Sequence, residues 1–207
     1  MPEMCLINRV QLVPVLAVDL VALPTDTGIA ELPRLKPGSW HVATSDFEDG
    51  AMLERVLAAN IASMGGVDAL ADPHNVPTLN GGLALKSSDG TVLIEPQCCS
   101  DLDTVRDWQT AARYRGQPCQ MLWIGHPWPS MRFEGERLIL SDLHESGEPI
   151  GRWSILPEDL QGALAAAKAQ LQQFARRIAP ILIDLGFRGN APVMAEKLAG
   201  LREKYTS

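Results

Sequence analysis

Two short stretches of the chain gather the residue types that carry out chemistry in proteins. The first runs from Glu95 to Leu102 and contains the adjacent cysteines Cys98 and Cys99, where an expected strand gives way to an expected helix. Unsatisfied N–H groups and the helix dipole at such a junction stabilise a thiolate. One hypothesis for the function is therefore a small enzyme that uses Cys98 or Cys99 as its nucleophile.

The same two cysteines also fit a packing role, and we favour that role. Free cysteine is among the most buried residue types, and the carboxylates of Asp101 and Asp103 nearby would oppose a thiolate. A cysteine nucleophile also needs a base. The chain offers His126 and His144, but no sequence pattern places either histidine beside the thiols. We therefore expect the thiols to be structural and packed.

Metal and cofactor chemistry has little support in the spacing of these residues. A zinc site is an alternative because the chain has suitable ligand types, namely Cys98, Cys99, Cys119, His126 and His144. Their spacing matches no zinc-binding pattern, however, and GxxxxGK[ST], GxGxxG, GxSxG and HExxH are absent from the sequence. We expect neither a metal nor a cofactor.

The second stretch runs from Trp123 to Pro129 and predicts a rigid aromatic loop after a strand. Pro127 and Pro129 restrict the residues before them to extended conformations. A stiff, exposed Trp128 would be an effective interface anchor, although tryptophan also commonly folds back over a sheet. An acidic run follows further along the chain. We expect a binding surface formed by His126, Trp128, Asp142 and Glu145.

Charge and composition limit the partners of this surface. The formal net charge is -7 and the isoelectric point is near 5.1, which argues against nucleic-acid binding and favours a basic protein partner. The four cysteines are too few for a disulfide scaffold, so reduced thiols in the cytoplasm fit best. The apolar segment 10–23 is too short to cross a membrane, and we interpret it as a strand. The oligomeric state stays open.

Turn and periodicity signals predict an α+β fold with a mostly antiparallel sheet packed against several helices. The expected extended segments are 12–23, 40–43, 82–86, 91–95, 121–124, 131–134 and 137–140, of which 82–86 and 91–95 form a hairpin. Capping-box spacing at Ser45 and Glu48, and at Ser100 and Asp103, predicts a helix over 46–64 and a shorter one ending before Gly116.

The strongest helix signal begins at Pro157. Apolar residues follow at alternating steps of four and three, which places them on one face: Leu160, Leu164, Ala167, Leu171, Phe174 and Ile178. Pro180 should end or kink this helix. A final helix is expected over 193–204. We expect one domain over residues 1–207, with 1–38 as an elaborated N-terminal segment and 157–207 as a helical C-terminal part.

Three stretches resemble a group of uncharacterised bacterial proteins: LNGGLAL at 79–85, EPQCCSDL at 95–102 and MLWIGHPWPSMRFE at 121–134. Through its Asn-Gly-Gly sequence, its tryptophan-bearing strands and its acidic balance, the chain also resembles the SMI1/KNR4-type immunity proteins of bacterial toxin systems. That resemblance implies an inhibitor that binds a toxin. The alternatives are the small enzyme, with a cysteine nucleophile or a His/Cys metal site, and a domain that binds a small ligand between sheet and helix.

Overall fold

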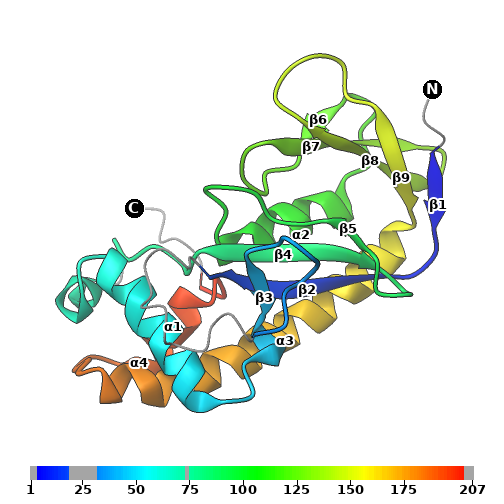
Figure 1. The fold of residues 1–207 in the computed structure, drawn as a ribbon. Coiled ribbons are helices and arrows are strands. Elements are labelled where there is room, and N and C mark those ends of the chain that lie inside the picture. Colours follow the sequence, from blue (N-terminus) through cyan, green and yellow to red (C-terminus); the bar gives the residue numbers. More distant parts are fainter. Residues whose placement is uncertain (1–3, 19–31, 73–74, 203–207) are drawn as a thin grey trace. The chain divides into compact units, whose positions relative to one another are not determined.

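The computed structural model describes residues 4–18, 32–72 and 75–202, and these residues confirm the α+β class (Figure 1). They form the α-helices α1 (Gly50–Ser63), α2 (Val105–Arg113), α3 (Pro157–Asp184) and α4 (Ala191–Leu198). Short 3-10 helices are η2 (Thr44–Asp46), η3 (Val67–Ala71) and η4 (Leu102–Thr104). No helix in these ranges is long and apolar enough to cross a lipid bilayer.

The strands form two mostly antiparallel sheets. The five-stranded sheet has the order β1-β9-β8-β7-β6, and its β1–β9 pair is parallel. Its strands are β1 (Cys5–Ile7), β6 (Gln120–Met121), β7 (Trp128–Glu134), β8 (Arg137–His144) and β9 (Gly151–Ile155). The four-stranded sheet has the order β3-β2-β4-β5. Its strands are β2 (Val10–Ala17), β3 (His41–Ala43), β4 (Gly81–Ser87) and β5 (Val92–Ile94).

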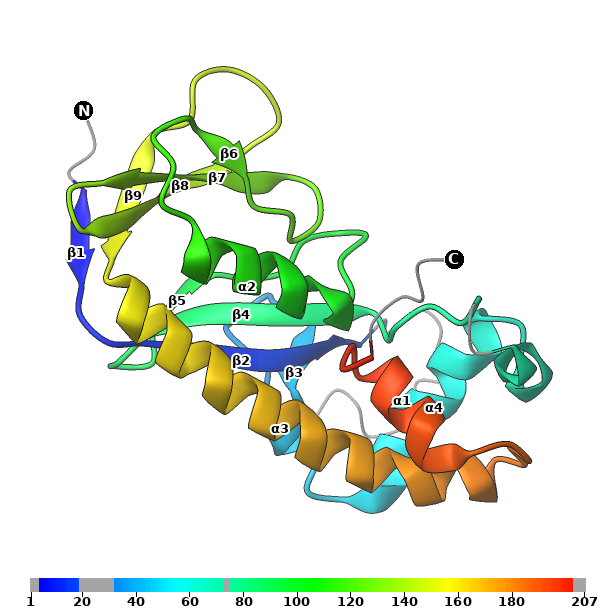
Figure 2. The same ribbon diagram turned by 180° about the vertical axis from the view of Figure 1, so that it is seen from behind.

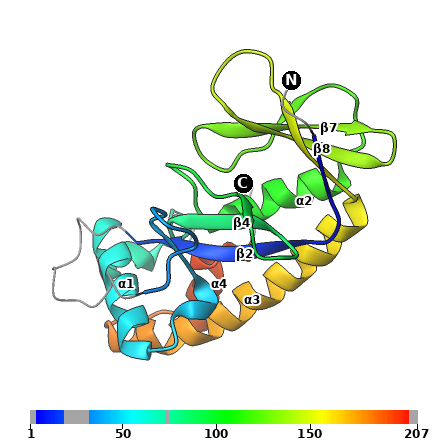
Figure 3. The same cartoon turned by 45° about the vertical axis from the view of Figure 1, so that its right-hand side comes forward.

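The chain divides into two compact units, and both are discontinuous in sequence. Unit 1 comprises Met1–Val13 and Gly82–Lys168, and unit 2 comprises Pro14–Gly81 and Ala169–Ser207. In unit 1, α2 lies on one side of the five-stranded sheet (Figure 2). In unit 2, α1 and α4 lie beside the C-terminal half of α3 (Figure 3). One domain over 1–207 stays a prediction, because compact packing does not measure independent folding.

The expected hairpin is confirmed as β4 and β5. Leu85 pairs with Ile94, and the Gly90 N–H donates to the Ser87 carbonyl oxygen at 3.0 Å to close the turn. The Asp89 carboxylate accepts hydrogen bonds from the Ser87 hydroxyl and the Thr91 N–H, and these bonds lower its pKa. Asp89 and Gly90, whose residue types predicted a turn here, therefore both take part in the hydrogen bonds that stabilise it.

The Asn-Gly-Gly sequence at 80–82 has a packing explanation. Gly81 has φ +147°, and a Cβ atom there would overlap the Val15 carbonyl oxygen of β2. Gly82 lies next to Pro96 and Ser100, and a Cβ atom there would come within 2.9 Å of each. Only glycine allows these close approaches without strain.

Two helices start differently from the expectation. Asp49, not Ser45, caps α1, since its side chain accepts a hydrogen bond from the Ala51 N–H at 2.9 Å. Likewise Asp101 accepts from the Asp103 N–H at 2.9 Å, and a 3-10 turn then leads into α2. Aspartate is as good a cap as serine, so the aspartate at the start of the helix takes the role.

The apolar face of α3 is buried as predicted. All six residues of the stripe are at most 8% exposed. The helix does not end at Pro180, however, and continues to Asp184. Ile178 and Leu182 on either side of Pro180 are fully buried, and we attribute the continuation to this packing, which offsets the missing backbone hydrogen bond.

Several strand and helix bounds also differ. The strand expected over 121–124 is only the two-residue β6, and β1 and β9 lack a clear sequence signal. Within the apolar segment 10–23, β2 ends at Ala17, and residues 19–23 lie outside the described ranges. The last helix, α4, covers Ala191–Leu198 where 193–204 was expected; residues 203 and 204 lie outside the described ranges.

Truncating Leu171 should test the packing of α3. Its side chain is fully buried, so Leu171→Ala should lower the free energy of unfolding by about 2–5 kcal/mol, as large-to-small core substitutions do. Gln173 is exposed on the same helix, and Gln173→Ala should change it by less than about 0.5 kcal/mol. Urea unfolding of both variants measures the difference. Equal effects would contradict the assigned face.

Candidate functional site

Four aromatic rings meet at one end of the β7–β8 hairpin in unit 1. Trp128 begins β7 and lies directly opposite His144 of β8, with ring centroids 6.4 Å apart. The ring of His126 is 4.9 Å from that of Trp128, and the ring of Trp123 is 6.0 Å away. We call Trp123, His126, Trp128 and His144 the aromatic cluster. Trp128 is at its centre, because it contacts all three other rings.

The aromatic cluster is partly accessible to solvent. Each of its four residues is half-buried, and 43% of the His126 side chain is exposed. Trp128 is thus neither a fully exposed anchor nor a ring fully folded back over the sheet. Its ring packs on its neighbours, and part of it stays accessible. Such tilted ring pairs stabilise one another beyond the area that they bury. The surface is therefore both ordered and open.

An acidic residue lies at the edge of the aromatic cluster. The Glu145 Oε1 atom is 3.5 Å from the His126 Nδ1 atom, and 62% of the Glu145 side chain is exposed. This pair contributes little to stability because water screens it. Asp142 is half-buried on β8, and its N–H donates to the Ile150 carbonyl oxygen at 3.0 Å. Three of the four expected binding residues thus meet, and Asp142 lies two positions before His144.

A buried polar chain holds His144 in place. The Ser130 Oγ and His144 Nε2 atoms share a hydrogen bond of 2.8 Å. The Ser130 N–H donates to Ser141 Oγ at 2.7 Å, and that hydroxyl donates to the Asp142 carbonyl oxygen at 2.6 Å. Sequence reasoning missed Ser130 and Ser141. The register of the β7–β8 hairpin is the signal that would have placed Ser130 near His144.

The cysteines are exposed, which contradicts the expectation that they pack in the core. Cys98 and Cys99 occupy the two central positions of a β-turn that the Ser100 N–H closes onto the Gln97 carbonyl oxygen at 3.2 Å. We call residues 97–100 the cysteine turn. The central residues of a turn project away from the chain, so local geometry overrides the general tendency of cysteine to be buried. Cys5 and Cys119 are exposed as well.

Hydrogen bonds join the cysteine turn to the segment that carries His126. The Gln97 N–H donates to the Ile124 carbonyl oxygen at 2.8 Å, and the His126 N–H donates to the Cys98 carbonyl oxygen at 3.0 Å. The Cys98 Sγ–H donates to the His126 carbonyl oxygen at 2.9 Å. Gly125 between them has φ +100°, and a Cβ atom there would lie 2.5 Å from the Cys98 carbonyl oxygen. Glycine is therefore required at this contact.

This geometry bears on the two chemical alternatives. The Cys98 sulfur donates its hydrogen bond to the backbone carbonyl oxygen of His126 and not to the imidazole ring. Within the described ranges, no group of three or more histidine, cysteine, aspartate or glutamate side chains could hold a metal ion.

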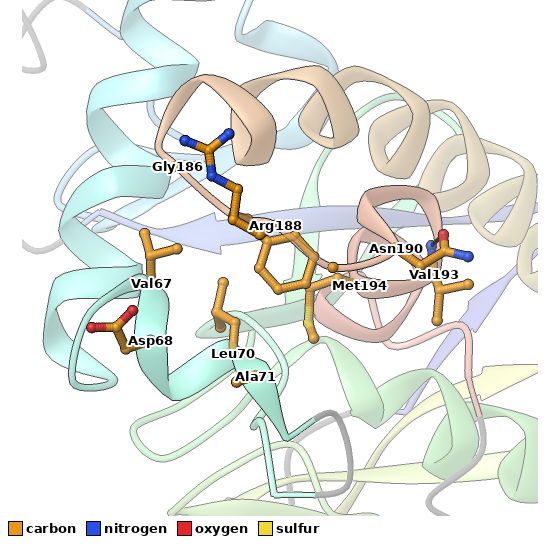
Figure 4. Close-up of a pocket in the computed structure, with 11 residues that line it drawn as sticks. Val67, Asp68, Leu70, Ala71, Gly186, Arg188, Asn190, Val193 and Met194 are labelled. Atoms are coloured by element: carbon orange, nitrogen blue, oxygen red, sulfur yellow. Dashed lines mark hydrogen bonds between the residues drawn. The ribbon is translucent and has the colours of Figure 1, made fainter.

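Unit 2 contains a pocket of about 350 Å³. It lies between η3 and the start of α4, together with the segment 186–190 that connects α3 to α4. Figure 4 shows Leu70 and Met194 near its middle, with Asp68, Arg188 and Asn190 around its margin. Its volume is at the lower end of the range for small-molecule sites.

Comparison of the chain with protein-family models, curated proteins and solved structures finds no match. The function therefore has to be inferred from the residues and their geometry. The aromatic cluster and the pocket lined by η3 and the start of α4 are two features that could recognise another molecule.

The Ser130–His144 hydrogen bond should be measurable as a contribution to stability. Ser130→Ala should lower the free energy of unfolding by about 1–3 kcal/mol, because it leaves a partly buried ring nitrogen without a partner. In a His144→Phe background the same change should cost less, since no nitrogen then loses its partner. Chemical denaturation of the four proteins in this double-mutant cycle gives the coupling. An equal cost in both backgrounds would mean that the bond contributes nothing.

Proposed function

We propose that the protein binds another protein through the aromatic cluster. The position of Trp128 carries this proposal: it is half-buried, and three neighbouring rings hold it at the surface. A tryptophan that is already held by its neighbours loses little conformational entropy when a partner covers it. Tryptophan is also among the residues that contribute most to interface affinity.

Charge supports a basic partner. Glu145 is largely exposed beside His126, and the chain carries a formal net charge of -7. Exposed carboxylates add little to affinity but attract a basic surface at long range and speed association. The aromatic cluster would then provide the contact area, and the acidic residues would select a partner with a basic surface.

An immunity-type inhibitor of a bacterial toxin is the biological role that we propose for this binding. Such a protein blocks a toxin by covering it and needs no catalytic residue of its own. The sequence resemblance supports this role, and so do the ordered aromatic surface and the acidic balance. The partner would then be an enzyme whose activity falls to zero at a one-to-one ratio with this protein.

Replacing Trp128 should weaken partner binding. Affinity capture from native cells with the wild-type chain, followed by mass spectrometry, should recover a basic protein in stoichiometric amount. Trp128→Ala should weaken binding of that protein by more than about 1 kcal/mol, as for an interface anchor. Trp40 is 52% exposed in unit 2, so Trp40→Ala is a matched control that should bind normally. Thermal unfolding verifies that both variants are folded.

Two results would contradict this proposal. Unchanged affinity of a folded Trp128→Ala variant would exclude the aromatic cluster as the interface, and capture of no stoichiometric protein would argue against a binding function. Association should also slow as salt is raised, because screening acts within about 10 Å at 0.1 M salt. A captured protein whose activity persists at a one-to-one ratio would rule out the inhibitor role.

The pocket of unit 2 favours a second candidate, the binding of a small ligand. Its apolar middle and charged margin suit a small molecule with an apolar group and a charged end. Ligand-observed NMR with a set of such molecules should detect binding that Val67→Trp, which places a large ring at the pocket wall, abolishes. If no molecule binds, or if Val67→Trp leaves binding intact, the pocket is not a ligand site.

A further inference from the structure

The cysteine turn places two thiols next to each other at the surface in a conformation that cysteine rarely adopts. Both side chains are exposed, and Cys99 has φ +63°. The third residue of a turn with such a φ is ordinarily glycine or asparagine, since a side chain there costs about 1–2 kcal/mol. The strain is tolerated because the bonds of residues 97 and 98 to the segment 124–126 fix the turn.

The two thiols differ in their hydrogen bonding. The Cys98 Sγ–H is engaged with the His126 carbonyl oxygen at 2.9 Å, and a thiolate would have no hydrogen to donate there. Among the described residues, the Cys99 sulfur has no hydrogen-bond partner, although it is exposed. The Cys99 sulfur can therefore react without breaking a hydrogen bond, whereas the Cys98 sulfur cannot.

The geometry points to the cysteine turn as a site of reversible modification by low-molecular-weight disulfides, with Cys99 as the attacking thiol and Cys98 as the resolving thiol. Only the thiolate of a cysteine attacks a disulfide, and access to the sulfur limits the rate. The Cys99 sulfur is exposed and can attack without first leaving a hydrogen bond. Cys98, one residue away, is at a high effective concentration for the second step.

The chemistry balances without any other reactant. The Cys99 thiolate attacks one sulfur of the small disulfide, whose S–S bond breaks, and the first small thiol leaves. Cys98 then releases its proton to solvent, and its sulfur attacks the Cys99 sulfur of the mixed disulfide and expels the second small thiol. Two protein thiols are oxidised to one disulfide, and the small disulfide is reduced to two thiols.

The resulting disulfide should reopen easily. Adjacent Cα atoms are about 3.8 Å apart across a trans peptide bond, less than the roughly 4.4–6.8 Å that unstrained disulfides span. Strained and exposed disulfides are readily reduced. The modification therefore suits a thiol pair that responds to the small-disulfide level and returns to its reduced state.

Oxidised glutathione tests this inference on the full-length, reduced protein. After incubation at about pH 8.5, where a free thiol is substantially ionised, peptide mapping by mass spectrometry should show the Cys98–Cys99 peptide lighter by two hydrogen atoms. In Cys98→Ser, whose hydroxyl keeps a donor toward the His126 carbonyl, glutathione should instead remain on Cys99. Cys5 and Cys119 are exposed without an adjacent thiol, so their glutathione adducts should persist in every variant.

Three results would overturn the inference. One is a wild-type protein in which glutathione persists on Cys99 and no Cys98–Cys99 disulfide forms. Another is a cysteine turn that stays unmodified while Cys5 and Cys119 react. The third is a Cys99→Ser variant that takes up glutathione on Cys98 faster than Cys98→Ser does on Cys99. Unchanged thermal unfolding of the reduced variants verifies that each result comes from a folded protein.

Discussion

The backbone bridge between Cys98 and His126 determines how the chemically distinctive residues of unit 1 are presented. It consists of the reciprocal contacts of these two residues and the neighbouring bond from Gln97 to Ile124. Gly125 makes it possible, since its left-handed φ and missing Cβ let the two segments approach. The bridge holds the thiols outward on one segment and brings the His126 ring to Trp128 on the other.

The register of the β7–β8 hairpin adds the second constraint. Glu134 lies opposite Arg137 at the turn, and Trp128 lies opposite His144 at the far end, with an irregularity between Pro129 and Met131 that shifts the pairing. Extra residues in one strand re-aim the side chains around them. The aromatic cluster therefore depends on this pairing as well as on the aromatic residues themselves.

Local signals predicted the elements better than the contacts between them. The Asp-Gly turn and the apolar stripe from Leu160 to Ile178 depend on neighbours in sequence, and both are present in the structure. His126, Trp128 and Glu145 lie close together in the structure, because a short loop and the end of the nearby strand β8 carry them. The contribution of His144 to this cluster required the strand register. The expectation that the cysteines are buried was wrong because it depended on a general tendency of the residue type. A left-handed turn position is predicted from sequence when glycine occupies it, and here the residue is Cys99.

The Ser130–His144 pair has the distance of a nucleophile and its base, yet its surroundings favour a positioning role. Ser130 is only 7% exposed, so a substrate cannot approach its hydroxyl. A catalytic base of this kind is also oriented through its second ring nitrogen by a third group, whereas the Nδ1 atom of His144 has no hydrogen-bond partner among the described residues. The His144 ring is instead held by Ser130 and supports one side of Trp128.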